Sequence, residues 1–174
     1  GEILAGGDSN HYFKTLPAPG SIQPVRIWAL GDSGTADGHA RAVRDAYLDL
    51  AAAERPADLL LMLGDNAYST GTDAEYQSAV FENMYEDILR NRVVWPTQGN
   101  HDLDAYFNVF DLPMAGEAGG IPSGTAAYYS VDLANGPLIC LDPPDLAYCS
   151  DTQRVISPRP APHPLHTPPP RTLP

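Results

Sequence analysis

Cysteine, basic residues and long apolar runs are all scarce in this sequence of 174 residues. The two cysteines, Cys140 and Cys149, fit no zinc-binding spacing and do not assign a redox compartment. No apolar run approaches the length of a membrane span, so the sequence predicts no membrane-spanning segment. Ten Lys and Arg residues stand against 22 Asp and Glu, and the net charge of −12 argues against nucleic acid or an anionic membrane surface as a partner.

A phosphorylated small-molecule substrate is compatible with this acidity, because bound metal ions can reverse the local charge of a site. An acidic balance is, however, more often a plain solvated surface. The length allows one domain with a sizeable core, and a hydrophobic content of 43% supports a folded chain. The chain begins with Gly1 rather than methionine, which indicates a processed product or a fragment. The sequence assigns no oligomeric state.

The first two thirds of the chain alternate short apolar strands with amphipathic helices. Predicted strands cover residues 25–30, 58–63 and 93–97, and predicted helices cover residues 39–55 and 73–90. The predicted inner stripes are Ala40, Val43, Tyr47 and Leu50 on the first helix, and Tyr76, Val80, Met84 and Ile88 on the second. Thr72 and Glu75 have the spacing of a capping box. The order strand, helix, strand, helix, strand predicts an α/β fold with a parallel sheet.

Three further segments differ from this pattern. Residues 127–133 and 138–141 predict a hairpin, because Asn135-Gly136 is a strong turn signal between them. Residues 11–15 resemble a lone strand. Proline makes up ten of the 32 residues in 143–174, and this composition predicts a disordered tail that is foreign to the preceding domain.

Each predicted parallel strand ends in a turn with side chains that can bind a metal. These side chains are Asp32, then Asp65 with Tyr68, then Asn100 with His101. The carboxyl ends of strands in an open parallel sheet are where ligands bind, and this donor set suits Fe, Mn or Zn. Any one of the turns alone would be typical of a helix cap or an Asx-turn. Three in succession predict a metal site, with a glycine before each to ease the turn (Gly31, Gly64 and Gly99).

These motifs resemble the first three blocks of the calcineurin-like metallophosphoesterase family. The blocks are residues 31–34 (Gly-Asp-Ser-Gly), 64–68 (Gly-Asp-Asn-Ala-Tyr) and 99–102 (Gly-Asn-His-Asp). Gly34 and Tyr68 resemble the purple acid phosphatase branch in particular. The resemblance covers residues 25–142 and implies a β-sandwich flanked by helices. Residues 1–24 resemble the end of a preceding fibronectin-like domain or a linker.

The resemblance also implies roles for individual residues. Asp32 and Tyr68 would bind a first metal ion, Fe(III), and Asp65 would bridge it to a second ion. Asn100 would bind that second ion, which would be Fe(II), Zn(II) or Mn(II). His101 would act near the phosphate or the leaving group as a proton or hydrogen-bond donor. Asp102 would orient His101 from behind, unless it is simply a solvated loop acid.

The function implied is that of a phosphoric monoester hydrolase, similar to acid phosphatases, that uses a dinuclear centre and a metal-activated hydroxide. The resemblance also implies an extracytoplasmic or secreted location. A phosphodiesterase or nucleotidase of the same fold is an alternative, because the three blocks define the metal site and not the substrate pocket. A non-catalytic module of this fold is a second alternative. The presence of all four predicted ligands (Asp32, Asp65, Tyr68 and Asn100) argues against it for the parent protein, whereas for this chain it stays an alternative.

The family pattern also requires a histidine from a fourth block and a His-x-His from a fifth. After His101 the sequence has only His163 and His166, which lie in the proline-rich tail and are poor candidates. The carboxyl-terminal half of the domain is therefore expected to be missing, through truncation, a change of reading frame or a misassembled gene. A chain of this kind is expected to be weakly active or inactive.

Overall fold

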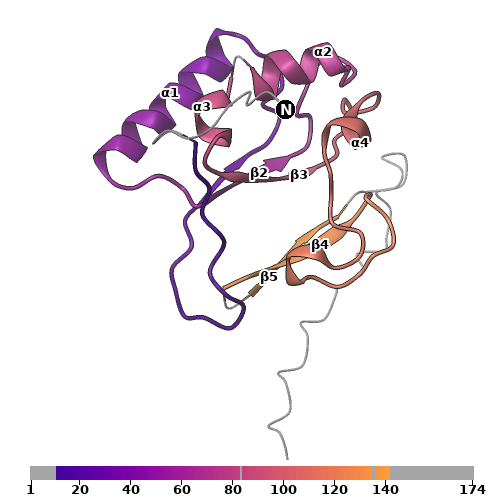
Figure 1. The fold of residues 1–174 in the computed structure, drawn as a ribbon. Coiled ribbons are helices and arrows are strands. Elements are labelled where there is room, and N and C mark those ends of the chain that lie inside the picture. Colours follow the sequence, from indigo (N-terminus) through magenta and orange to yellow (C-terminus); the bar gives the residue numbers. More distant parts are fainter. Residues whose placement is uncertain (1–10, 83, 135, 142–174) are drawn as a thin grey trace, which may run out of the picture. The chain divides into compact units, whose positions relative to one another are not determined.

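A three-stranded parallel sheet and a separate antiparallel hairpin form the β-structure of this protein (Figure 1). The computed structural model describes residues 11–82, 84–134 and 136–141. The parallel strands, in the order β1-β2-β3, are β1 (Ile27–Leu30), β2 (Leu59–Leu63) and β3 (Val93–Thr97). The hairpin consists of β4 (Tyr129–Leu133) and β5 (Gly136–Cys140). The predicted order of elements and the parallel pairing are confirmed.

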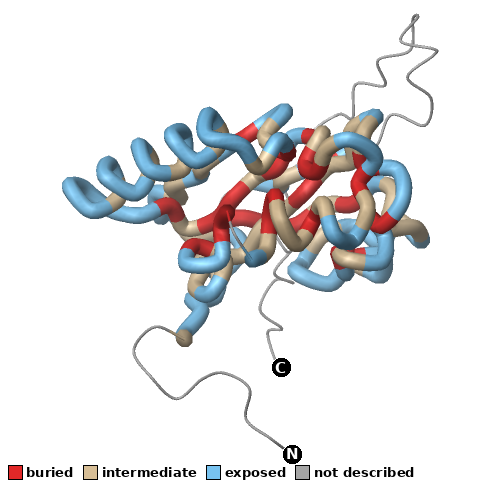
Figure 2. Tube along the Cα trace, turned by 90° about the horizontal axis from the view of Figure 1, so that it is seen from above, coloured by how far each residue is buried: buried red, intermediate tan, exposed pale blue. Residues whose placement is uncertain are grey.

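Helix α1 (Gly38–Ala53) connects β1 to β2 and has no buried residue, as its pale and tan tube shows in Figure 2. The predicted inner stripe is wrong in part, because Val43 and Leu50 are 54% and 52% exposed. The half-buried positions are instead Ala40, Arg44, Tyr47 and Ala51. The rotation of the helix follows from Tyr47, whose ring stacks on Trp28 of β1 at a centroid distance of 3.8 Å.

The second helical segment is broken where the sequence predicts one continuous helix. It consists of α2 (Asp73–Tyr76), the π-helix η1 (Gln77–Phe81) and α3 (Glu86–Leu89). Two wide-turn bonds, from Glu82 N to the Gln77 carbonyl (2.8 Å) and from Tyr85 N to the Val80 carbonyl (3.1 Å), replace the regular α-helical pattern there. The inner stripe is confirmed nonetheless, since all four of its residues are buried: Tyr76, Val80, Met84 and Ile88.

The core covers the helical face of the sheet and continues into the hairpin, where Tyr129, Val131 and Leu133 are buried. Trp28 meets Tyr85 edge-on at 5.8 Å on the helical face. The Tyr129 hydroxyl of β4 donates to the Pro96 carbonyl (2.6 Å). Two short helices, α4 (Tyr106–Val109) and η2 (Glu117–Gly119), lie between β3 and β4 in the chain. The bond from Tyr129 to Pro96 fixes the carboxyl end of β3, where the candidate site begins.

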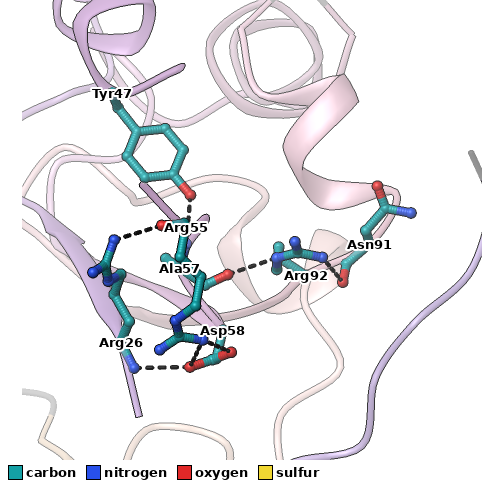
Figure 3. A network of polar contacts seen from close by, with 7 residues as sticks. All are labelled: Arg26, Tyr47, Arg55, Ala57, Asp58, Asn91 and Arg92. Atoms are coloured by element: carbon teal, nitrogen blue, oxygen red, sulfur yellow. Dashed lines mark hydrogen bonds and ion pairs between the residues drawn. The ribbon is translucent and has the colours of Figure 1, made fainter. Parts of the chain in front are cut away.

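A polar network ties together the opposite, amino-terminal ends of the strands (Figure 3). The Asp58 carboxylate accepts from the backbone N–H of Arg26 (2.8 Å) and from the Arg55 guanidinium (2.8 Å). Burial opposes ionisation of Asp58, but these bonds outweigh it, so the pKa of the carboxyl is below its usual value. Arg92 donates to the Ala57 carbonyl (2.6 Å), which links β3 to the start of β2. These acidic and basic groups are therefore structural and lie at the end of the sheet away from the candidate site.

The strand predicted at residues 11–15 is not found, because this segment pairs with no strand of the described residues. The Tyr12 carbonyl accepts a single bond from the Asn91 side chain (2.9 Å). The proline-rich segment 143–174 lies outside the described residues. None of the described helices is both long enough and apolar enough to cross a membrane.

Candidate metal centre

The three predicted turns lie next to one another at the carboxyl ends of β1, β2 and β3. The Asp32 N–H donates to the Gly64 carbonyl and the Gly34 N–H donates to the Asp65 carbonyl, both at 3.0 Å, which joins the first turn to the second. The His101 N–H donates to the Asp65 carboxylate oxygen Oδ1 (3.1 Å), which joins the second turn to the third. The turns thus form one connected surface.

The turning residues differ in part from those that the sequence predicts. Of the three glycines, only Gly64 has a positive φ (+98°). Asp32 and Asp65 themselves adopt left-handed conformations, with φ values of 58° and 53°. Asp tolerates this region better than most residues because its short polar side chain can bond locally. Gly99 is needed for a different reason, because a Cβ atom there would lie 2.2 Å from the Asp65 backbone nitrogen.

Three side-chain oxygens converge between the first and second turns. The Tyr68 hydroxyl contacts Asp32 Oδ1, and it lies 3.0 Å from Asp65 Oδ2. A hydroxyl has one proton and can donate a hydrogen bond to only one of these two carboxylate oxygens. Two carboxylates that share one site repel each other unless a proton or a cation lies between them. Asp32, Asp65 and Tyr68 therefore form an oxygen set suited to a hard cation.

The third turn brings His101 to this oxygen set and leaves Asn100 less constrained. The His101 ring lies 4.6 Å from the Tyr68 ring between centroids. The carbonyl of Ser69 lies 2.7 Å from His101 Nδ1. Since a carbonyl only accepts, Nδ1 carries the proton, and Nε2 is the nitrogen available to a substrate. Asn100 is exposed, and its side chain forms no hydrogen bond with any described residue.

Asp102 has a different role from the predicted one. Its carboxylate does not orient the His101 ring, which the Ser69 carbonyl holds instead. Asp102 is completely buried and accepts from the backbone N–H groups of Asn66 (2.9 Å) and Gly99 (2.8 Å) and from the Tyr76 hydroxyl (2.6 Å). The physical reason is that these donors are buried and a single carboxylate satisfies them all. Asp102 therefore joins the second turn, the third turn and α2.

This network shifts the pKa of one of its members. Burial, together with the bond to the Asp102 carboxylate, raises the pKa of the Tyr76 hydroxyl well above its usual value. Tyr76 therefore stays a neutral donor. The sequence identified Tyr76 only as a core residue, and the signal that could have shown more is its polar hydroxyl at a fully buried stripe position.

The residues present supply part of the donor set of a metal site. The described part of the chain has no group of three His, Cys, Asp or Glu side chains that could hold a metal ion. The convergent set instead combines two carboxylates with a phenol, and the exposed Asn100 amide lies nearby in the third turn. Hard cations accept such oxygen donors. Asp65 lies between Tyr68 and the third turn, because one of its carboxylate oxygens faces Tyr68 and the other faces the third turn.

Comparison with known families agrees with this geometry. The family model described as calcineurin-like phosphoesterase matches residues 25–158, which is more than half of the chain. The chain belongs to the calcineurin-like phosphoesterase family. Comparison with individual curated proteins gives no significant match. The family match begins at the first residue of the predicted domain and extends past residue 142.

Membership in this family sets the function at a coarse level. Calcineurin-like phosphoesterases hydrolyse phosphoesters with the help of bound metal ions, generally two. The α/β fold with a parallel sheet and flanking helices is the fold expected of the family. A phosphoester substrate is consistent with it. The chain is therefore built on the framework of a metal-dependent phosphoester hydrolase.

Proposed function

We propose that the chain carries the first metal-binding half of a phosphomonoesterase of the purple acid phosphatase type. The observation that carries this proposal is the convergence of the Tyr68 hydroxyl with the carboxylates of Asp32 and Asp65. In this proposal Tyr68 and Asp32 hold Fe(III), and Asp65 bridges to a second ion, Fe(II), Zn(II) or Mn(II), beside Asn100. A location outside the cytoplasm belongs to the same proposal.

The first turn supports this branch over relatives with a histidine ligand at position 34. A Cβ atom on Gly34 would lie 2.4 Å from the Ala67 backbone nitrogen, so this conformation has no room for any side chain there. The phenol of Tyr68 supplies a donor at the same edge of the sheet. The lack of room at position 34, together with the phenol of Tyr68, supports a tyrosine ligand in the proposed site.

In the proposed hydrolysis, some residues would hold the metal ions and His101 would act on the substrate. Bound metal ions supply Lewis acidity and lower the pKa of a bound water. Asp32, Asp65 and Tyr68 would hold these ions. Asp102 holds the second and third turns together. His101, with its proton on Nδ1 held by the Ser69 carbonyl, presents Nε2 to the phosphate or the leaving group. In its protonated form Nε2 donates to that oxygen.

The test combines a spectrum with a choice of substrate. A phenolate on Fe(III) gives a visible charge-transfer band, so the Fe(III)-loaded chain should be coloured and Tyr68→Phe should be colourless. Hydrolysis of p-nitrophenyl phosphate should exceed that of bis(p-nitrophenyl) phosphate. The rate should fall below the order of 1 s⁻¹ usual for enzymes, because the described residues supply none of the further histidine ligands that the family pattern requires. Colourless wild-type protein would overturn the tyrosinate proposal, and faster diester hydrolysis would favour a phosphodiesterase.

A further inference from the structure

The loop between Tyr68 and α2 is held by one carboxylate. Glu75 accepts from the backbone N–H groups of Ser69 (2.6 Å), Thr70 (3.2 Å) and Thr72 (2.9 Å). A capping box requires only the bond to Thr72. The other two bonds reach backward out of the helix into the loop. Accepting these backbone bonds lowers the pKa of Glu75 from 4.5 to about 2, so the side chain is charged at neutral pH.

The same loop holds His101 from its other side. The Ser69 carbonyl, which faces His101 Nδ1, and the Thr70 N–H, which faces Glu75, belong to one peptide unit. A trans peptide is planar, and its C=O and N–H point in opposite directions. Glu75 therefore fixes the N–H end of this unit while His101 bonds to its C=O end. Hydrogen bonds connected in this way polarise and strengthen one another.

Other contacts set the position of the loop. They do not fix the orientation of the Ser69–Thr70 peptide, which therefore depends on Glu75. The Thr70 carbonyl accepts from the N–H groups of Leu103 (3.0 Å) and Asp104 (3.1 Å). Gly71 has a φ of +71°, and a Cβ atom there would lie 2.8 Å from the Asp102 Cα. The loop is thus docked on residues 101–105 at Thr70 and Gly71. These contacts do not involve the Ser69 carbonyl.

We propose that Glu75 is a positioning residue for His101. By fixing the Ser69–Thr70 peptide, it holds the imidazole in the tautomer with the proton on Nδ1 and keeps Nε2 for the substrate. The proposal rests on the proposed function, in which His101 acts at the phosphate or the leaving group. The role is distinct from helix capping, which Glu75 shares with Thr72.

The test measures the tautomer directly and needs neither metal nor activity. In the full chain with ¹⁵N-labelled histidine, nitrogen chemical shifts separate the two neutral tautomers above the titration range of histidine. His101 is assigned by loss of its signals in His101→Gln. Wild type should show the Nδ1–H form, and Glu75→Gln should show a mixture, because a neutral amide is a weaker acceptor for the three N–H groups.

Two matched variants separate positioning from capping. Thr72→Ala removes the other half of the capping box, and Glu117→Gln alters a carboxylate that caps a different loop through the Ala115 N–H (2.8 Å). Both should keep the wild-type tautomer. If Glu75→Gln keeps the Nδ1–H form, or if Thr72→Ala changes the tautomer as much, the proposal is wrong. Should Glu75→Gln fail to fold, Glu75→Asp replaces it in the test, because aspartate keeps the charge and is too short to reach Ser69. Glu75→Asp should then show the mixture of tautomers, and the Nδ1–H form alone would contradict the proposal.

Rates of phosphate ester hydrolysis test the proposed function separately from the positioning role. If His101 serves the leaving group, Glu75→Gln should slow an alkyl phosphate about tenfold more than p-nitrophenyl phosphate, whose leaving group needs little protonation. The additional loss should vanish in a His101→Ala background. A tautomer change in a chain that hydrolyses bis(p-nitrophenyl) phosphate faster than p-nitrophenyl phosphate would support the positioning role and overturn the proposed function. An equal loss on both substrates would contradict action through His101.

Discussion

Asp102 is a charged side chain without exposed surface, and its carboxylate is surrounded by donors from three elements. Besides Asn66, Gly99 and Tyr76, it accepts from the Ala67 N–H at 3.2 Å. A buried carboxylate with this many bonds stabilises the fold only as long as all partners remain. The candidate metal-binding turns thus depend on a residue that is itself not a predicted ligand.

Removal of a single donor should measure this dependence. Tyr76→Phe leaves the ring in the core and deletes one bond to a charged acceptor, so the free energy of unfolding should fall by about 1.5–3 kcal/mol. Tyr128→Phe is the matched control, because Tyr128 is 49% exposed and should change stability by less than about 0.5 kcal/mol. Urea unfolding of the chain gives both values. Equal stability of the two variants would show that the network contributes little.

The proximity of the candidate site residues could be predicted from the sequence, but their individual contacts could not. Asp32, Asp65, Tyr68 and His101 come together as the order of strands requires. That Asp102 faces inward, away from the His101 ring, depends on how the loop after β3 closes, with the Asp102 N–H donating to the Gly99 carbonyl (3.2 Å). Neither periodicity nor motif spacing contains that information.

At the scale of elements, apolar spacing predicted the second helical segment better than the first. Tyr76, Val80, Met84 and Ile88 are buried even though the segment changes from α to π geometry. In α1, one aromatic stack decides the rotation, and apolar Val43 and Leu50 turn outward. Propensity and spacing cannot reveal such a contact, because Trp28 belongs to a different element.

The corrected face of α1 leads to a stability prediction. Tyr47→Phe keeps the stack on Trp28 but removes the hydroxyl that accepts from the Ala57 N–H (3.0 Å), which should cost about 0.5–1.5 kcal/mol. Leu50→Gln, at a position 52% exposed, should change the free energy of unfolding by less than about 0.5 kcal/mol. Thermal or urea unfolding compares them. A larger loss for Leu50→Gln would restore the stripe predicted from the sequence.

The bonds from Glu75 to the loop before α2 predict that the stability of the chain depends on pH. The pKa of Glu75 is lowered from 4.5 to about 2 in the folded chain, so its contribution is complete above pH 4.5 and is lost as pH falls through about 2. Glu75→Gln should therefore be less stable than wild type at neutral pH, and the difference should shrink over that window. Unfolding midpoints measured across this range test it. A constant difference would mean that Glu75 does not gain its bonds on folding.

For the whole molecule, the parallel sheet is unevenly covered. Ile27 and Leu63 lie on the face opposite Trp28 and are 42% and 56% exposed. Parallel sheets normally have both faces covered. This exposure agrees with the expectation that only part of the two-layer fold is present in the described residues. The first three blocks are nevertheless assembled, because they depend on β1, β2, β3 and the loops that connect them.

The central claim is that these three turns bind metal, and the metal content of the purified chain tests it most directly. After incubation with Fe, Zn or Mn and removal of excess ion, we expect at least one tightly bound ion per chain. Asp65→Ala should lose it, because both carboxylate oxygens face the predicted site. Asp49→Ala, on the exposed surface of α1, should retain it. No bound metal in wild type, or equal content in wild type and Asp65→Ala, would contradict the account.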